Sequence, residues 1–324
     1  MPRLERLEQW LARGSSTVLA AGWQQWLLDE FCAGRFAPMP WAQVASAAGV
    51  ASLQHAWLAT PVHLVAGIDT VRLHPAGLLT LDETEQQQLA DDFAKVFEGS
   101  GWTLKATGRR ELLLGSAAPH HARSSDPARW LGADPGQGTS TGAQARELRR
   151  LASELEMWLH EHAVNRARSA RGELAASGLW LWGGALAPAP AAPVAVSTQP
   201  VSAGAGATPL CVFGADLFLE GLARLAGSCS RPLPAPWPAD RAALQIDADS
   251  DAIVHCMLGA AQGPESLLAL ESQLVAPLMR QLRRGDWNAL TLLVGDRAVT
   301  LRRPGWRLWR PLKRSRPWWQ SLLG

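Results

Sequence analysis

The chain has 324 residues, 47% of them hydrophobic, and its 31 basic and 29 acidic side chains give a formal net charge of +2. This length is enough for a substantial core and suggests about two domains or one large α/β unit. Fibrous, acidic disordered and disulfide-stapled classes are excluded, and the near-balanced charge argues against a dedicated nucleic-acid binder.

The cysteines and the charge-free stretches restrict the compartment. No two of the four cysteines, Cys32, Cys211, Cys229 and Cys256, have CxxC spacing, so we expect a reduced, cytoplasmic environment. The first 13 residues carry acidic side chains among apolar ones, which is unlike a signal peptide. Residues 36–68 and 174–215 lack charged side chains, but Pro and Gly interrupt both, so neither is expected to span a membrane.

The first half of the chain predicts helices followed by strands and a helix. Residues 1–50 are predicted to be helical, and residues 57–73 alternate as strands do. A helix is predicted over residues 82–97, because Asp82 and Glu85 have the spacing of a capping box. Residues 102–106 and 111–114 are predicted to form a hairpin. Residues 119–142 are predicted as loop, and one long helix is predicted over residues 143–168.

The second half alternates strands and helices around a linker. Strands are predicted at residues 179–182, 210–213, 243–246, 252–257, 290–294 and 299–301, and helices at 216–226 and 265–284. The predicted fold class is α/β, a mixed sheet flanked by helices with a helical N-terminal extension. We predict a helical segment at 1–50, an α/β region at 51–184, an Ala/Pro-rich linker at 185–208 and a second α/β region at 209–324.

Two polar segments could carry chemistry. The Gly-rich loop at residues 132–142 lacks the Lys-Ser/Thr pair of a P-loop, so it is either a surface loop or an anion site on free helix amides. Residues 154–171 are rich in Glu, His and Arg, but their His-Glu-His order differs from the His-Glu-x-x-His of zinc proteases. From residue types alone, this second segment is a solvated helix face.

A longer pattern around the second segment resembles a known family. His162, Asn165, Arg168 and Gly172, followed by the Trp-Leu-Trp-Gly run at residues 180–183, resemble the signature of archaeal-type cofactor-independent phosphoglycerate mutases, which belong to the alkaline phosphatase superfamily. Ala163 and Ser177 depart from it, since that signature has Pro and Asn there.

The resemblance extends further along the chain. Asp216 with the Gly-Leu-Ala run at residues 221–223 is similar to the family's next strand and helix. Over almost the whole chain, residues 60–64, 79–81, 154–160, 277–285 and 306–310 resemble a bacterial phosphoglycerate mutase-like group that includes the RpfE regulatory proteins. An alkaline-phosphatase-like fold is therefore expected.

The resemblance also implies catalytic equipment: two divalent cations, usually manganese or zinc, and a Ser that carries the phosphoryl group. The nearest counterpart of the late Asp-His ligand pair is Asp296-Arg297, and a guanidinium cannot ligate a cation. We therefore expect no catalytic residues, no metal and no cofactor, and a regulatory protein that binds a protein partner or a small anionic ligand. The alternative is an active metal-dependent mutase.

The resemblance leaves three tentative ligand-binding residues, His162, Asn165 and Arg168. Arg168 is the natural anion clamp, because its planar fork matches phosphate oxygens. A structural role for Arg168 is the open alternative.

The C-terminal residues 302–319 combine seven basic side chains with four tryptophans. Such a segment contacts membrane surfaces or nucleic acid in some proteins. The alternative is a packed strand followed by a solvated tail. Trp318 and Trp319 are the tryptophans that the sequence leaves for a partner surface.

Overall fold

The computed structural model describes most of the chain, namely residues 2–20, 22–32, 41–48, 53, 55–67, 70–120, 122, 124–134, 136, 140–142, 144–184, 210–214, 216–247, 250–254, 264–294, 297–303 and 317–318. The predicted linker at 185–208 and most of the basic tail lie outside the described residues. None of the described helices combines the length and the apolar character that a membrane-spanning helix requires.

The first lobe contains a five-stranded antiparallel sheet centred on β2 (His55–Ala66). The N-terminal half of β2 pairs with β5 (Leu112–Ser116), its middle with β6 (Gly178–Trp182) and its C-terminal part with β3 (Val71–Leu78). β4 (Trp102–Lys105) completes the sheet beside β5, so the predicted hairpin is confirmed.

Three helices of this lobe pack together with the sheet. They are α4 (Glu83–Val96), α5 (Ala145–His160) and α6 (Ala163–Ala170). Leu89 and Phe93 of α4 and Leu148 and Leu155 of α5 recur at helical spacing, and they are buried together with Leu181 of β6. The predicted capping box at the start of α4 is confirmed.

The second lobe contains two smaller sheets. β7 (Leu210–Phe213) lies between β8 (Cys229–Arg231) and β9 (Asp251–Val254), and all three are parallel. β10 (Ala289–Val294) and β11 (Arg297–Arg302) form an antiparallel hairpin. The chain is therefore α/β as predicted, and the predicted mixture of strand directions is divided among separate sheets.

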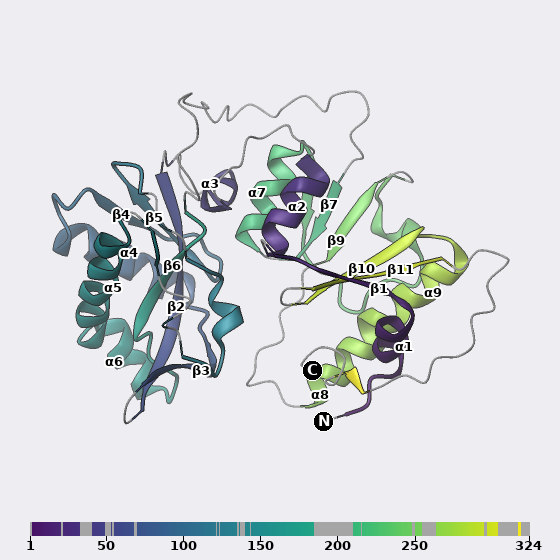
Figure 1. The fold of residues 1–324 in the computed structure, drawn as a ribbon, viewed down its shortest axis with the longest axis horizontal. Coiled ribbons are helices and arrows are strands. Elements are labelled where there is room, and N and C mark those ends of the chain that lie inside the picture. The colour runs from purple at the N-terminus through teal and green to yellow at the C-terminus, as the bar shows by residue number, and fades with distance from the viewer. Residues whose placement is uncertain are drawn as a thin grey trace.

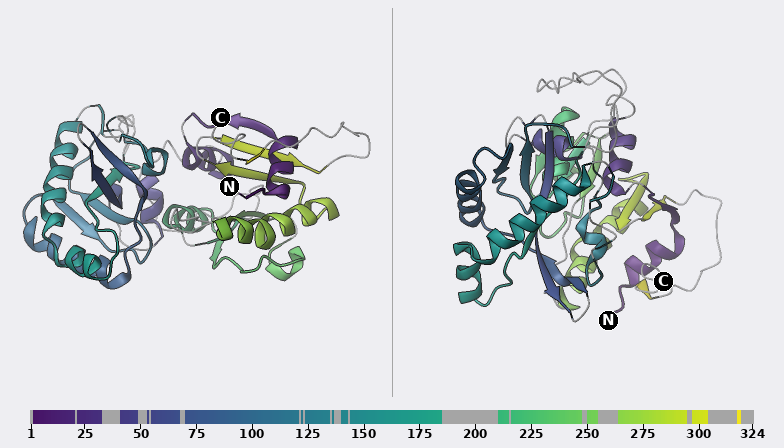
Figure 2. Two further views of the ribbon diagram at one scale, coloured as in Figure 1. Left: turned by 90° about the horizontal axis from the view of Figure 1, so that it is seen from below. Right: turned by 60° about the vertical axis from the view of Figure 1, so that its left-hand side comes forward.

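Helices cover both faces of the parallel sheet. Val212 of β7 belongs to the same core as α7 (Leu217–Leu225), whereas Phe213 packs in the core of the opposite face. That face is covered by a nearly continuous helix made of α8 (Pro264–Leu270), the π-helical turn η4 (Glu271–Val275) and α9 (Ala276–Arg284). Figure 2 shows this long helix running along the second lobe.

The N-terminal segment joins the two lobes. α1 (Glu5–Arg13) contacts η4, and β1 (Ser15–Val18) pairs antiparallel with β11. α2 (Trp23–Cys32) leads to α3 (Trp41–Ser46), which packs against β2 of the first lobe and α7 of the second. Figure 1 shows α3 between the lobes. The segment is helical as predicted, with the unpredicted strand β1.

Two predictions about local structure are wrong. The helix predicted over 143–168 is two helices, because His162 adopts an extended backbone (φ −69°, ψ 144°) and caps the second one. The strand predicted at residues 243–246 does not form. Residues 241–244 instead make a 3₁₀ turn, η3 (Arg241–Leu244), which Gln245 ends with a φ of 52°. Trp318, for which no structural role was predicted, is partly buried in the core of the second lobe, where its indole N–H donates to the Pro2 carbonyl.

Two short elements of the structure were not predicted from the sequence. The predicted loop at 119–142 contains a 3₁₀ turn, η1 (Pro127–Trp130), whose Asp126 accepts the Ala128 N–H. The tripeptide Cys229–Arg231, for which no strand was predicted, is strand β8. Both segments are too short for their sequence periodicity to reveal them.

Candidate functional site at the first turn of α4

The site is built on the capping box that begins α4. The Asp82 carboxylate accepts the Glu85 N–H at 2.8 Å, and the Glu85 carboxylate accepts the Asp82 N–H at 3.0 Å. These contacts satisfy amides that a helix start leaves unpaired, and they hold Glu85 in one orientation. Because Glu85 is only 7% exposed, its negative charge needs a partner.

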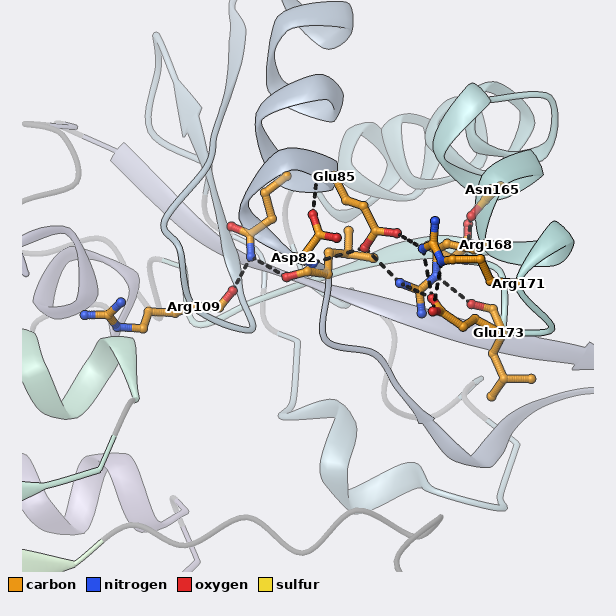
Figure 3. Close-up of polar contacts among 11 residues, drawn as sticks. Asp82, Glu85, Arg109, Asn165, Arg168, Arg171 and Glu173 are labelled. Atoms are coloured by element: carbon orange, nitrogen blue, oxygen red, sulfur yellow. Dashed lines mark hydrogen bonds and ion pairs between the residues drawn. The ribbon is translucent and has the colours of Figure 1, made fainter. Parts of the chain in front are cut away.

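Two arginines from the end of α6 supply that partner. Arg168 donates from Nη1 to Glu85 Oε2 at 2.9 Å, and Arg171 donates from Nη2 to Glu85 Oε1 at 2.6 Å. Both arginines also contact Glu173, at 3.3 Å from Arg168 Nη1 and 3.0 Å from Arg171 Nε. Two guanidinium groups thus meet two carboxylates, and Figure 3 shows the four side chains converging.

The outer part of this cluster is open to solvent. About half of the Arg171 and Glu173 side chains is exposed, whereas Arg168 and Glu85 are buried. The hydrogen bond from Arg171 lowers the pKa of the Glu173 carboxyl, and the same bond raises the pKa of Arg171. Glu173 is therefore a carboxylate at neutral pH, and it is the exposed one of the two carboxylates in the cluster.

Asn165 holds the backbone on both sides of α6. Its amide nitrogen donates to the carbonyls of Leu159, at 2.7 Å, and Ala176, at 2.8 Å, while its carbonyl oxygen accepts the Ala176 N–H at 2.8 Å. The side chain is 5% exposed. Asn165 therefore ties the end of α5 to the segment that enters β6.

His162 serves as the N-cap of α6. Its Nδ1 accepts the Val164 N–H at 3.2 Å, which places the proton of the neutral ring on Nε2. Nε2 lies 3.3 Å from Asp92 Oδ2, and the ring packs edge-on against Trp158. Burial lowers the pKa of His162, so the ring is neutral at physiological pH.

The Trp-Leu-Trp strand β6 fastens the sheet to its surroundings. The indole N–H of Trp180 donates to the Ser125 carbonyl, and that of Trp182 donates to the Thr60 hydroxyl, each at 2.8 Å. Both rings are buried. The indoles therefore combine apolar packing with satisfied polar ends, which is a structural use of the motif.

The three predicted ligand residues face different partners. Arg168 contacts Glu85 and Glu173, His162 contacts Asp92, and the Asn165 amide is occupied by backbone. Their role as anion ligands stays a prediction. Glu85, Arg171 and Glu173 were not predicted as site residues, although the capping box at Glu85 and the spacing of the arginines at 168 and 171 were visible in the sequence.

The cluster does not suit a divalent cation. Both oxygens of Glu85 accept hydrogen bonds from guanidinium groups, and a cation placed there would lie beside two fixed positive charges. Within the described part of the chain, no group of three His, Cys, Asp or Glu side chains is arranged to hold a metal ion. Arg297 begins β11, and Asp296 lies outside the described residues.

A second contact network starts at the neighbouring residue of α4. Gln86 is 1% exposed, and its carbonyl oxygen accepts the N–H groups of Thr107, at 3.1 Å, and Gly108, at 3.2 Å. Its amide nitrogen donates to the carbonyls of Leu81 and Arg109. Gln86 therefore fixes the turn between β4 and β5, and Figure 3 shows Arg109 pointing from that turn away from the Glu85 cluster.

Comparisons with known proteins give distant structural likenesses. No family model matches the chain, and no curated protein matches it. The cofactor-independent phosphoglycerate mutase from Thermoplasma acidophilum has a TM-score of 0.36 and 15% identity, over 96% of this chain and 86% of that chain. The PH0037 protein from Pyrococcus horikoshii has a TM-score of 0.41 and 13% identity, over 92% of this chain and 80% of that chain. Both TM-scores lie below 0.5, so neither likeness identifies a function for this chain.

Proposed function

We propose that this chain is a phosphoglycerate mutase-like regulatory protein of the cytoplasm, which binds a protein partner or a small anionic ligand and transfers no phosphoryl group. The observation that supports the proposal is the set of contacts that the Arg168 and Asn165 side chains make. Both are buried, and their side chains bond to Glu85 and to backbone groups of the same lobe. The residues that carry the resemblance thus support the fold, and the chemistry of Arg297 does not suit a metal ligand.

An anion would enter this site by displacing the Glu173 carboxylate from Arg168 and Arg171. Glu173 is the exposed carboxylate of the cluster. If its side chain moved away, Arg168 and Arg171 would keep one buried counter-charge, that of Glu85. A phosphate or carboxylate of the ligand would then occupy the same donors, since guanidinium groups bind either class of oxygen anion. The proposed ligand is therefore small and acidic.

The first test separates a binding protein from an active mutase. The purified chain is expected to contain no stoichiometric manganese or zinc by elemental analysis, and to show no mutase turnover when either metal is added. Tightly bound metal together with turnover would contradict the proposal and establish the metal-dependent alternative, in which manganese or zinc is the cofactor.

The second test concerns the anion. Inorganic phosphate is titrated into the wild-type chain and into the Glu173→Gln and Arg168→Lys variants, with the heat of binding as readout. Glu173→Gln removes the competing charge and is expected to bind phosphate more tightly than wild type. Arg168→Lys keeps the charge but loses the fork, so weaker binding is expected. Equal binding by all three proteins would refute the anion site.

The basic tail provides the remaining partner hypothesis, contact with a membrane surface. Binding to anionic vesicles that weakens with salt, and is lost on deletion of residues 310–324, would support such contact. No binding at low salt would leave a protein partner or a soluble anion as the ligand class.

A further inference from the structure

The turn between β4 and β5 is linked by charge to α7 of the other lobe. Arg109 donates from Nε to Glu220 Oε1 at 2.6 Å and from Nη2 to Glu220 Oε2 at 2.9 Å. This parallel pair of bonds is the strongest geometry of an arginine and a carboxylate. Because Gln86 holds the backbone of the turn, the Arg109 side chain joins two elements that are each fixed in their own lobe.

The next two residues of the turn lie deeper. Arg110 donates from Nε to Glu111 Oε1 at 2.7 Å, and the Glu111 carboxyl is almost fully buried. Asp216, 6% exposed, caps α7 by accepting the Leu219 N–H at 2.9 Å. Asp216 and Glu111 interact electrostatically with each other and with Arg110, so the turn and the start of α7 form one electrostatic unit.

Among the described residues, the carboxyl groups outnumber the guanidinium groups in this unit. Arg109 and Arg110 face four acids, of which Glu220 is neutralised by Arg109. Asp126, which faces Asp216 from the segment before η1, accepts hydrogen bonds from the Gln24 amide of α2 and from the Ala128 N–H. α3, which packs on α7, has no charged residue. The acids of this group are Glu111, Asp126, Asp216 and Glu220.

The Arg110 guanidinium is therefore left to balance the negative charge of Glu111, Asp126 and Asp216. Glu111 and Asp216 are nearly inaccessible to water. Two negative charges in such surroundings repel each other, and burial removes the water that would stabilise them. Burial raises the pKa of both Glu111 and Asp216. The favourable arrangement is one ionised carboxyl paired with Arg110 and one neutral carboxylic acid beside it.

We propose that Glu111 and Asp216 together retain one proton at neutral pH, and that its loss loosens the contact between the β4–β5 turn and α7. The two lobes are thus joined by a clasp, defined here as Arg109, Arg110, Glu111, Asp216 and Glu220, whose strength depends on pH. Neither Arg168 nor the anion site takes part in it.

The direction of the pH dependence follows from the proton count. The closed clasp binds one proton more than the open one, in which the acids meet water and ionise at their ordinary values. The clasp is therefore strongest below those ordinary values. Between the ordinary values and the raised pKa of the closed state its opening constant increases about tenfold per pH unit, and above the raised pKa the opening constant no longer changes with pH.

The test uses the full chain and amide hydrogen exchange, corrected for the intrinsic effect of pH. Exchange in α7 and at residues 107–112 is measured from acidic to alkaline pH, for wild type and for Glu111→Gln and Asp216→Asn. Wild type is expected to lose protection in these segments at alkaline pH, while the variants keep it. Asn at position 216 still offers an oxygen to the Leu219 N–H, so the cap of α7 remains.

A matched control is Asp240→Asn, because Asp240 forms an exposed ion pair with Arg284 elsewhere in the second lobe. This variant should behave as wild type. The infrared carbonyl band of a protonated carboxylic acid gives a direct readout that does not depend on opening: it should be present in wild type at neutral pH and missing in Glu111→Gln or Asp216→Asn. Protection that is equally pH-dependent in all four proteins, or an unchanged infrared band, would overturn the proposal.

Discussion

Asn165 shows what a single side chain contributes to the first lobe. Its three hydrogen bonds reach backbone groups of Leu159 and Ala176 that are far from water. Deletion of the amide leaves those groups unpaired, and an unsatisfied buried group costs about 1–3 kcal/mol.

The substitution Asn165→Ala is therefore expected to lower the free energy of unfolding by about 3 kcal/mol. Urea denaturation measures this change. The matched control is Asn288→Ala, since the side chain of Asn288 is exposed and its change should stay within about 0.5 kcal/mol of wild type. A loss no larger than that of the control would mean that water replaces the amide.

His162 gives the first lobe a defined response to acid. Its pKa is lowered by burial, so the neutral ring is favoured in the folded chain. The stability it confers is complete above the ordinary pKa of histidine and is lost as the pH falls through the lowered value. Protonation also fills Nδ1, which then can no longer cap α6.

We expect His162→Asn to reduce the loss of stability between about pH 7 and pH 5, because Asn caps helices well and carries no charge. Thermal denaturation across this range measures the effect. His160→Asn is the control, since His160 is exposed on α5. Parallel pH profiles for wild type and His162→Asn would show that another group dominates the acid response.

The importance of Arg168 and Asn165 was visible in the sequence, but their partners were not. The motif predicted polar chemistry at these residues, and the structure gives them Glu85 and backbone carbonyls as partners. Residue 85 precedes Arg168 by 83 positions. Such a pairing depends on how α4 and α6 meet, and local spacing cannot encode it.

At the scale of elements, prediction succeeded where one local signal decided the outcome. The capping box defined the start of α4. The strands predicted over residues 57–73 correspond to β2 and the beginning of β3, but residues 56–62 of β2 are all buried instead of alternating. The break between α5 and α6 was missed because His162 is an unusual cap, and the apolar stripe continues across it. The short strand β1 was missed because all four of its residues are exposed, so burial leaves no alternating pattern.

The crossing of α3 and α7 depends on one residue without a side chain. A Cβ at Gly221 would lie 1.7 Å from the Val44 carbonyl oxygen, which belongs to the backbone of α3 and cannot rotate away. The two helices must therefore separate before any larger residue fits.

We expect Gly221→Ala to destabilise the chain by at least about 2 kcal/mol, since overpacking costs about 1–3 kcal/mol even where side chains can shift. The midpoint of urea denaturation is the measurement. Arg224→Ala, on the exposed face of the same helix, serves as control and should be nearly neutral. A stable Gly221→Ala variant would show that α3 moves freely against α7.

At the scale of the whole molecule, the N-terminal segment is held by the distant second lobe. The Glu271 carboxylate of η4 accepts the N–H groups of Arg6 and Leu7, which a helix start leaves unpaired. Leu4, Leu7 and Trp10 share a core with α9 and the β10–β11 hairpin. α1 therefore belongs structurally to the lobe that comes last in the chain.

Glu271→Ala is expected to increase hydrogen exchange in α1 about tenfold, because loss of a helix cap typically costs about 1 kcal/mol and a charge at the N-terminus is lost with it. Exchange in α4 should be unaffected. Glu265→Ala is the control, since Glu265 is exposed on α8. Unchanged protection of α1 in Glu271→Ala would mean that packing alone holds it.

The pairing of β1 with β11 has a consequence for how the protein is made. Ser15 lies opposite Thr300, so β1 can pair only after the chain as far as β11 has left the ribosome. Until then α1 and β1 expose apolar surface and an unpaired edge to the cell. Chaperone binding to the nascent chain should accordingly be strong at α1 and β1 and decrease when β11 emerges.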